Sequence, residues 1–455
     1  MFSASTKKLR HLPFFSASWR IRPSADFFFF LFSYFLITCE KQTTPVEDKR
    51  PVLNVTLQDV AVTEAWLQIE TGKTTPEDSL ILLRNDSAVF RMFPVKSDTL
   101  VYDEGLLPAH EYNYQTVISR RGHIMVIEEL TATTMDTTSH DFQWEIIEFP
   151  SPFGSGALYD IAIVSKFEAW AVGEIYADSA KPWLPYNAVH ITLETGGGVE
   201  LESLRIPYIY NGSPIVSPLS WVYAQNENDI WFSNSVHWNG KYFENADIAV
   251  SIFSGIGINK IWGTPDGELY VVGNKGNIAY SPDHGSNWQK LESGTDLPIQ
   301  DIWGMTDPQT GKQIILAPAS TKYTWNVPLL LNISPAGVSR EFLSVYNLIH
   351  SVWFKSLRKV YLCGSGVYCR TNGTWNRLPD LPTIFTNRIR GNDDNDIWVV
   401  GDFGIALHFN GVSWREYPQL WLQNGKWEGL AVTNDLVAIV GRKGADAVMV
   451  VTRLN

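Results

Sequence analysis

Cysteine and positive charge are both scarce in this sequence. The 455 residues include three cysteines, Cys39, Cys363 and Cys369, which is too few for a fold stapled by several disulfides. Cys363 and Cys369 flank a predicted hairpin on which they would sit diagonally, so we expect two buried free thiols. Thirty-six Lys and Arg residues stand against 48 Asp and Glu, for a net charge of −12. Such an acidic chain excludes nucleic acid as the expected partner, because a phosphate backbone needs a basic footprint.

Several catalytic and helical patterns are also missing. No long stretch has the apolar period of an amphipathic helix. No G-x-S-x-G, P-loop or dinucleotide-binding glycine motif occurs in its required setting. The nine histidines are scattered without the short spacing that is typical of metal ligands. We therefore expect no cofactor, no metal and no catalytic residues.

Apolar and aromatic residues are abundant. Hydrophobic residues make up 45% of the chain and aromatic residues 13%, with 18 Trp. Large flat side chains of this kind suit packing between stacked sheets. The 33 Gly and 24 Pro provide for many turns, so the composition predicts an all-β protein. Its length predicts two or more structural units.

The N-terminus has the layout of a signal peptide, with five basic residues, an apolar run over 27–38 and then Cys39. Leu36-Ile37-Thr38-Cys39 resembles the bacterial lipobox, which implies lipidation of Cys39 and anchoring in the cell envelope, facing the periplasm or the exterior. Ordinary secretion and an uncleaved anchor are the alternatives. Residues 1–39 would be the signal peptide and 40–50 a polar linker. Removing a segment of charge +4 would leave −16 on the chain from Cys39, so the lipid rather than protein charge would hold the membrane.

Residues 51–138 predict a β-sandwich of short strands at 54–60, 65–69, 80–84, 99–102, 112–118 and 125–131. Leu106-Leu107-Pro108 followed by Tyr112 resembles the fibronectin type III motif before strand F. The resemblance implies that the Tyr112 hydroxyl locks the corner between two strands.

From residue 142 to 455 a short phrase repeats. Lys260-Ile261-Trp262-Gly263 returns as Asp301-Ile302-Trp303-Gly304, and its continuation returns near residues 360 and 396. A period of about forty residues is typical of four-stranded propeller blades. The innermost strands would start near Tyr159, Ser220, Asn259, Gln300, His350, Thr386 and Trp427. The sequence thus predicts a seven-bladed β-propeller, closed by a strand at 142–149 that completes the last blade.

One turn makes the family resemblance more specific. Ser281-Pro282-Asp283-His284-Gly285-Ser286-Asn287-Trp288 resembles the Asp-box of BNR or sialidase-type repeats, in which Ser281, Asp283, Gly285 and Trp288 would be structural. The propeller also resembles the Ycf48-type photosystem assembly factors. Leu204-Arg205-Ile206-Pro207 is similar to the arginine element of sialidases, and Arg388 and Arg390 would share one strand face. The acidic run 392–396 is expected to be a solvated turn rather than a calcium loop.

The predicted function is a non-catalytic scaffold that binds an envelope protein or a glycan. Propellers bind through loops at one face, here those joining strands two and three of a blade or leading to the next blade. The candidate binding residues in these loops are Tyr176, Asp178, Trp183, Asn274, Lys275, Lys322, Tyr323, Asp402 and Phe403. The alternatives are a carbohydrate-active enzyme, with acids around the central channel, and an assembly factor for a membrane complex. An enzyme should show perturbed carboxylates near an arginine or histidine in the channel mouth.

Overall fold

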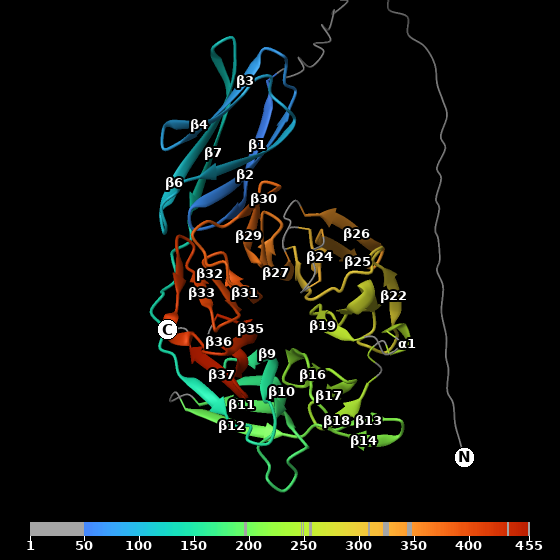
Figure 1. Ribbon diagram of the computed structural model, residues 1–455. Coiled ribbons are helices and arrows are strands. Elements are labelled where there is room, and N and C mark those ends of the chain that lie inside the picture. The colour runs from blue at the N-terminus through green and yellow to red at the C-terminus, as the bar shows by residue number, and fades with distance from the viewer. Residues whose placement is uncertain are drawn as a thin grey trace, which may run out of the picture. The chain divides into compact units, whose positions relative to one another are not determined.

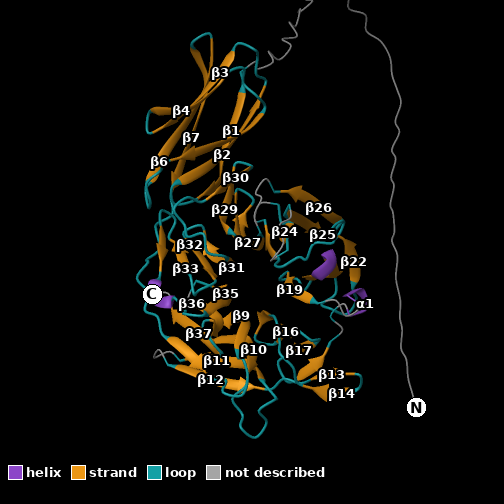
Figure 2. Cartoon of the chain, viewed as in Figure 1, coloured by secondary structure: helices purple, strands orange, loops and turns teal. Residues whose placement is uncertain are grey.

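The computed structural model describes residues 50–194, 198–246, 248, 250–253, 257–307, 310–321, 327–343, 348–434 and 436–453. The predicted signal peptide, Cys39 and residues 40–49 of the linker lie outside the described residues. Arg50–Asn455 form one compact unit. Within the described residues, strands dominate (Figure 2), and no helix has the length and apolar character needed to cross a membrane.

The N-terminal part consists of two antiparallel sheets. One has the order β1-β2-β5 and the other β4-β3-β6-β7. Their strands are β1 (Val52–Val60), β2 (Glu64–Gly72), β3 (Asp78–Arg84), β4 (Ser87–Met92), β5 (Asp98–Glu104), β6 (Glu111–Arg120) and β7 (His123–Thr133). Six of these overlap predicted strands. The sequence analysis missed β4, because it follows a two-residue turn, Asn85-Asp86, in which both residues have positive φ although neither is glycine.

Buried side chains from both sheets share one core, which includes Leu67, Leu80 and Tyr114. The Tyr112 hydroxyl lies 2.8 Å from the backbone nitrogen of Leu107 and accepts its hydrogen bond. This contact links the start of β6 to the segment that precedes it, which is the position expected for a tyrosine that fixes a corner.

Seven four-stranded sheets follow in the described part of the chain, each built from strands consecutive in sequence except the last. Their strands, sheet by sheet, are β9 (Ala157–Ser165), β10 (Glu168–Ile175), β11 (Tyr186–Leu193), β12 (Val199–Leu204); β15 (Val222–Asn226), β16 (Asp229–Phe232), β17 (Val236–Trp238), β18 (Phe243–Asn245); β19 (Ile258–Gly263), β20 (Leu269–Gly273), β21 (Asn277–Ser281), β22 (Gln289–Glu292); β23 (Trp303–Thr306), β24 (Gln313–Ala319), β25 (Leu329–Ser334), β26 (Gly337–Phe342); β27 (Ile349–Ser356), β28 (Lys359–Gly364), β29 (Gly366–Thr371), β30 (Thr374–Arg377); β31 (Thr386–Asp393), β32 (Asp396–Gly401), β33 (Ala406–Phe409), β34 (Trp414–Glu416); and β35 (Gly425–Val432), β36 (Leu436–Lys443), β37 (Asp446–Arg453), β8 (Ile146–Phe149).

The first strands of these sheets form a closed ring. Each contacts the first strand of the next sheet, and β35 contacts β9 (Figure 1). The last sheet is completed by β8, which pairs with β37 from Ala447↔Phe149 to Val450↔Ile146. The expected closing strand at 142–149 is therefore present over its second half. Such pairing of the two ends removes two open sheet edges.

Smaller elements lie between the sheets. They are the hairpin β13 (Tyr208–Tyr210) and β14 (Ser213–Ile215), the short helix α1 (Val250–Phe253), and the 3-10 turns η1 (Asn274–Gly276) and η2 (Pro418–Leu420). The hairpin accounts for part of the long first repeat, which the sequence analysis attributed mainly to a loop at 175–185.

The repeated phrase has a packing explanation. A Cβ atom on Gly304 would lie 2.6 Å from the ring of Trp262, and one on Gly391 would lie 2.7 Å from the ring of Trp353. An aromatic residue on one first strand thus covers a glycine on a later one. Glycine is needed there because the neighbouring ring occupies the space of a side chain.

Ion pairs join the N-terminal sheets to the ring, among them Arg358 with Asp59 at 3.8 Å. Lys359 Nζ donates to Glu64 Oε1 at 2.7 Å, and both side chains are largely buried. The same ammonium lies 5.9 Å from the centre of the Trp66 ring. These contacts hold the start of β28 against β2.

Candidate functional site

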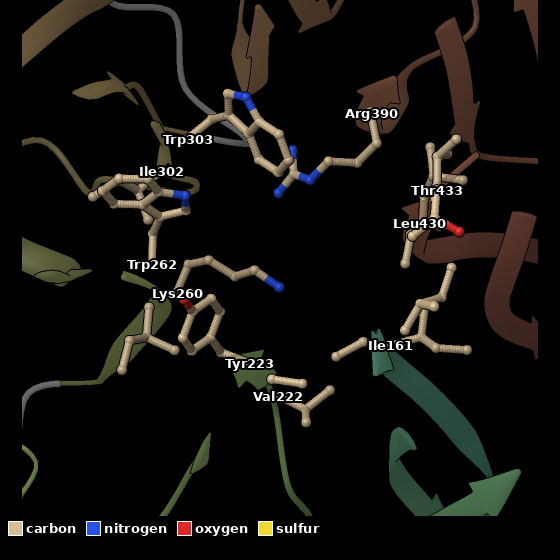
Figure 3. Close-up of a pocket in the computed structure, with 16 residues that line it drawn as sticks. Ile161, Val222, Tyr223, Lys260, Trp262, Ile302, Trp303, Arg390, Leu430 and Thr433 are labelled. Carbon is tan, nitrogen blue, oxygen red and sulfur yellow. The ribbon is translucent and has the colours of Figure 1, made fainter. Parts of the chain in front are cut away.

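A pocket of about 230 Å³ opens among the first strands of the ring (Figure 3). Its walls come from six of the seven sheets. The lining residues are Ile161, Ala162, Ile163, Val222, Tyr223, Ala224, Lys260, Ile261, Trp262, Ile302, Trp303, Arg390, Leu430, Ala431, Val432 and Thr433. The pocket is therefore a product of ring closure, since no single sheet provides more than a small part of it.

Aromatic and aliphatic side chains dominate these walls. Tyr223, Trp262 and Trp303 come from three neighbouring sheets, and Leu430 lies across from them (Figure 3). The Trp303 indole is fixed by a 3.0 Å hydrogen bond from Nε1 to the carbonyl of Phe354. Fixed aromatic walls offer apolar contact area at low entropic cost.

Among the described residues that line this pocket, the charged side chains are all cationic. The Lys260 ammonium points into the cavity, and the Arg390 guanidinium lies beside Trp303, 5.0 Å from its ring centre (Figure 3). No aspartate or glutamate is among the sixteen lining residues that the structure describes. The pocket thus pairs an apolar wall with positive charge.

A buried ionic cluster supports Arg390 from behind. Asp301 is fully buried and accepts bonds from Arg390 Nη2 at 2.7 Å and Nη1 at 2.8 Å. Ser351 Oγ donates to the same carboxylate at 2.5 Å, and Arg388 Nη1 lies 2.9 Å from it. Burial alone would raise the pKa of Asp301, but Arg390 and Arg388 outweigh it and hold that pKa well below its ordinary value. The shared face expected for the two arginines is present.

Lys260 is bound by a second buried carboxylate, that of Asp160. Its ammonium is hydrogen-bonded to Asp160, whose carboxylate also accepts the backbone N–H of Val222 at 3.0 Å. Burial lowers the pKa of Lys260 to about 8, although Asp160 acts in the opposite direction. Lys260 is therefore mostly charged at neutral pH and becomes neutral within a mildly alkaline range.

These groups suit binding better than acid–base catalysis. The carboxylates of the cluster are buried and ion-paired, and the pKa of Asp301 is shifted away from that of a general acid. Asp301 and Asp160 do lie near cationic side chains of the ring, and the pKa of Asp301 is shifted. They stand outside the pocket wall, however, and their oxygens are taken up by Arg390, Lys260 and backbone groups.

The sequence-predicted binding residues lie elsewhere in the sheets. The described ones occupy loops between second and third strands, whereas the pocket is lined by residues in or next to the first strands. Because each second strand runs antiparallel to its first strand, those loops lie at the N-terminal ends of the first strands. None of the described candidates lines the pocket, and Lys322 and Tyr323 lie outside the described residues.

The described candidates differ in their surroundings. Trp183 and Phe403 are 73% and 63% exposed. Tyr176 donates to Glu174 at 2.7 Å, Asp178 pairs with Arg205 at 2.9 Å, and Asp402 accepts from Asn387 at 3.1 Å. Asn274 accepts from Asn259 at 3.1 Å, and the neighbouring Lys275 has a φ of 54°. Trp183 and Phe403 are each exposed enough to contact a partner. Asp178 and Asp402 instead bind neighbouring side chains of the same protein.

The other motifs also resolve into local contacts. Arg205 lies over the Tyr186 ring at 4.2 Å and pairs with Asp178, so it does not join Arg388 and Arg390 at Asp301. In the acidic run, Asp393 pairs with Lys355 at 2.5 Å and Asp394 is buried. Cys363 and Cys369 are buried free thiols, and burial raises the pKa of Cys363 to about 12.

The turn at residues 281–288 is held by its own polar atoms. Asp283 Oδ1 accepts from the backbone of Asn287 at 2.8 Å, and Ser281 Oγ accepts from the backbone of Gly285 at 2.8 Å. Hydrogen bonds from Asn287 lower the pKa of Asp283. Partly buried Trp288 packs against the core that contains Trp231 of the preceding sheet.

The sequence analysis did not identify the pocket residues as a binding site, although it quoted several of them. Lys260, Trp262 and Trp303 belong to the repeated phrase, which was interpreted only as a mark of architecture. Period-two alternation along the phrase places Lys260 and Trp262 on one face, which was the available signal.

Comparisons with known proteins identify the fold. No protein-family model and no curated protein matches the chain. The solved structure of Ycf48 bound to D1 peptide matches with a TM-score of 0.51 and 16% identity, over 70% of this chain and 97% of that one. The WD40 β-propeller domain of Doa1 matches with a TM-score of 0.47 and 10% identity, over 69% and 97%. The likeness to Ycf48 shows a β-propeller domain.

Proposed function

We propose that this protein is a non-catalytic binding scaffold of the cell envelope, and that the pocket in the propeller ring receives a segment of a protein partner. The observation that carries the proposal is the pocket lining, which combines three aromatic residues with Lys260 and Arg390 and contains no carboxylate. Such a lining complements an apolar group next to a negative charge.

The volume of the pocket limits the size of the group that it can bind. At about 230 Å³ it is smaller than the roughly 300–1,000 Å³ of pockets that enclose drug-sized ligands. It fits one or two side chains, such as an acidic residue beside an apolar one, or a C-terminal carboxylate. The Ycf48 structure holds a D1 peptide, so a propeller of this fold can carry a peptide ligand. An assembly factor of the Ycf48 type for a membrane complex is a narrower version of the same proposal.

Catalysis is the weaker alternative. Glycoside hydrolysis uses two carboxylates on either side of the scissile bond, and the pocket wall has none. A glycan ligand remains compatible with the aromatic walls, since sugars stack on tryptophan faces. The lysine and arginine favour the peptide over a neutral glycan.

The surrounding architecture belongs to the same proposal. The seven sheets would be the blades of a BNR-like propeller, with the hydrogen bonds of Asp283 supporting an Asp-box turn. Residues 51–138 would be a fibronectin type III-like spacer, supported by the contact of Tyr112 with Leu107. Lipid on Cys39 would anchor the chain in the membrane of a bacterial envelope.

Affinity purification from native membranes tests the function. Tagged full-length protein is crosslinked gently, purified and identified with its partners by mass spectrometry, beside Trp262→Ala and Trp183→Ala. We expect one stoichiometric protein partner that Trp262→Ala loses and Trp183→Ala keeps. Cys39→Ser should move the protein out of the membrane fraction. Recovery of the protein alone, with glycan-array binding that Trp262→Ala abolishes, would replace the peptide by a sugar.

A further inference from the structure

Three sheets of the ring carry the same cross-strand unit, in which a carboxylate holds a tryptophan and a histidine. The units are Glu168 with Trp170 and His190, Asp229 with Trp231 and His237, and Asp396 with Trp398 and His408. In each, the indole donates to the carboxylate and the imidazole stacks on the indole at 4.2–4.4 Å. The unit is thus a repeated structural feature of the sheets. A copy with an additional group is therefore a candidate for a different role.

The copy at Asp229 differs by a third group from the next sheet. His284, in the turn between β21 and β22, places Nε2 3.2 Å from Asp229 Oδ2. His237 Nε2 lies 2.8 Å from Asp229 Oδ1. One ligand atom from each of the three residues lies within 4.8 Å of the others, and no other such group occurs among the described residues. At Asp396 the additional histidine, His140, contacts His408 instead of the carboxylate.

The backbone holds His284 in this position. Its φ is 57°, and its N–H donates to the carbonyl of Gly267 at 3.1 Å. A Cβ on Gly267 would lie 3.2 Å from His284 Nδ1, so the absence of a side chain there admits the imidazole. The Asp-box hydrogen bonds of Asp283 fix the same turn. The third group is therefore presented by a rigid turn.

A further carboxylate orients His237. Glu244 Oε1 lies 3.1 Å from His237 Nδ1, and Glu244 Oε2 is held by Asn239 Nδ2 at 2.9 Å. With a proton on Nδ1, the lone pair of Nε2 faces the Asp229 carboxylate. Two lone-pair donors at 2.8 Å repel each other unless a proton or a cation lies between them. A carboxylate behind a histidine is the usual support of a metal-binding imidazole.

We propose that Asp229, His237 and His284 bind a divalent transition-metal ion, zinc by the chemistry of the ligands. One carboxylate oxygen and two imidazole nitrogens make a mixed set that zinc accepts, with a fourth position open to water or a partner's side chain. Zn–N and Zn–O bonds of about 2.0–2.1 Å place tetrahedral ligand atoms about 3.3 Å apart. The contacts of 2.8 and 3.2 Å are made to different oxygens of Asp229, and the three ligand atoms lie within 4.8 Å of one another. To bind one ion, the two imidazoles and one carboxylate oxygen therefore have to adjust toward the tetrahedral spacing. This site is independent of the peptide-binding proposal.

Zinc binding by the full-length chain tests the proposal. Protein carrying a non-histidine tag is purified in detergent, stripped with EDTA and dialysed against ZnCl₂, and bound metal is measured by mass spectrometry. We expect one zinc ion per chain and a rise in melting temperature on adding zinc. His284→Asn should lose both, because asparagine tolerates positive φ but lacks the imidazole. Glu244→Gln should raise the Kd about 10- to 100-fold.

A matched control is present in the chain. His190→Asn removes the equivalent imidazole from the unit at Glu168, so it should keep the zinc and the zinc-dependent rise in melting temperature. Absence of stoichiometric zinc in the wild type would overturn the proposal. So would equal loss of zinc from His284→Asn and His190→Asn, which would indicate general destabilisation. Circular dichroism of the stripped proteins separates loss of the site from loss of the fold.

Discussion

Arg390 donates two hydrogen bonds to the carboxylate of Asp301, a residue 89 positions earlier in the chain. The pair joins the fourth and sixth sheets across Ser351 of the fifth, which also bonds to Asp301. It closes the ionic cluster behind the pocket and presents the guanidinium to Trp303. The binding surface and the link between the fourth and sixth sheets therefore depend on the same ion pair.

Replacing Asp301 should destabilise the ring. Asp301→Asn leaves two buried guanidinium groups without their counter-charge, which is expected to reduce the free energy of unfolding by about 3–5 kcal/mol. Chemical denaturation measures it. The control is Arg121→Ala, which removes an exposed ion pair with Glu77 and should leave stability nearly unchanged. Equal effects of the two substitutions would contradict the role of the cluster.

Lys260 should titrate below the ordinary lysine range. With a pKa of about 8 in the folded state, the unfolded chain binds more protons between pH 8 and 10.5, so this residue makes the fold more stable as pH rises through that window. Competitive acetylation followed by peptide mass spectrometry gives the pKa directly. A midpoint near 8 is expected at Lys260, and one near 10.4 would show that burial does not control it.

Asp394 is expected to weaken the fold at neutral pH. Burial raises its pKa to about 6, and its Oδ1 accepts no hydrogen bond from any described residue. Because the folded state binds this proton more tightly than the unfolded state, the contribution of Asp394 to stability falls as pH rises from about 4 to 6. Asp394→Asn should therefore add about 2–3 kcal/mol at pH 8 and little near pH 4.

The neighbouring carboxylate provides the comparison for Asp394. Asp393→Asn removes a partly exposed pair with Lys355 and should reduce stability by less than about 1 kcal/mol at pH 8. Thermal denaturation of both variants at the two pH values tests the sign. Destabilisation by Asp394→Asn at pH 8 would mean that its charge is compensated, with Lys359 as the nearest candidate.

Replacing the glycine of the repeated phrase by alanine should destabilise the protein. Gly304→Ala would place Cβ 2.6 Å from the Trp262 ring and is expected to reduce stability by about 1–3 kcal/mol. Gly72→Ala is the control, because its Cβ would meet only Val52 Cβ at 3.6 Å. It should be within about 0.5 kcal/mol of wild type. Similar melting temperatures for both variants would remove the packing explanation of the repeat.

The sequence predicted much of this architecture because repetition multiplies a weak local pattern. Each first strand carries the same alternation, so the starts near Asn259, Gln300 and Thr386 could be located without knowledge of their partners. β4 was missed because its turn contains no glycine or proline. The pairing of β8 with β37 was accessible to a topological argument, since a ring must close.

The site was less accessible, because it depends on how residues from six different sheets meet. Loop position favoured Trp183 and Phe403, which are exposed, over Lys260 and Trp262, which appeared to be ordinary repeat residues. The proposed zinc ligands gave no signal in the sequence for a related reason. His237 and His284 belong to different sheets, so their spacing in sequence carries no metal motif.

Site-specific photocrosslinking tests the central claim that the pocket in the ring binds a protein partner. Benzoylphenylalanine replaces Trp262 in the pocket or Trp183 in the loop between β10 and β11, and full-length protein is irradiated in native membranes. The account predicts one crosslinked partner from position 262 and none from position 183. A partner crosslinked from position 183 but not from position 262 would contradict it and move the binding surface to the loops between second and third strands.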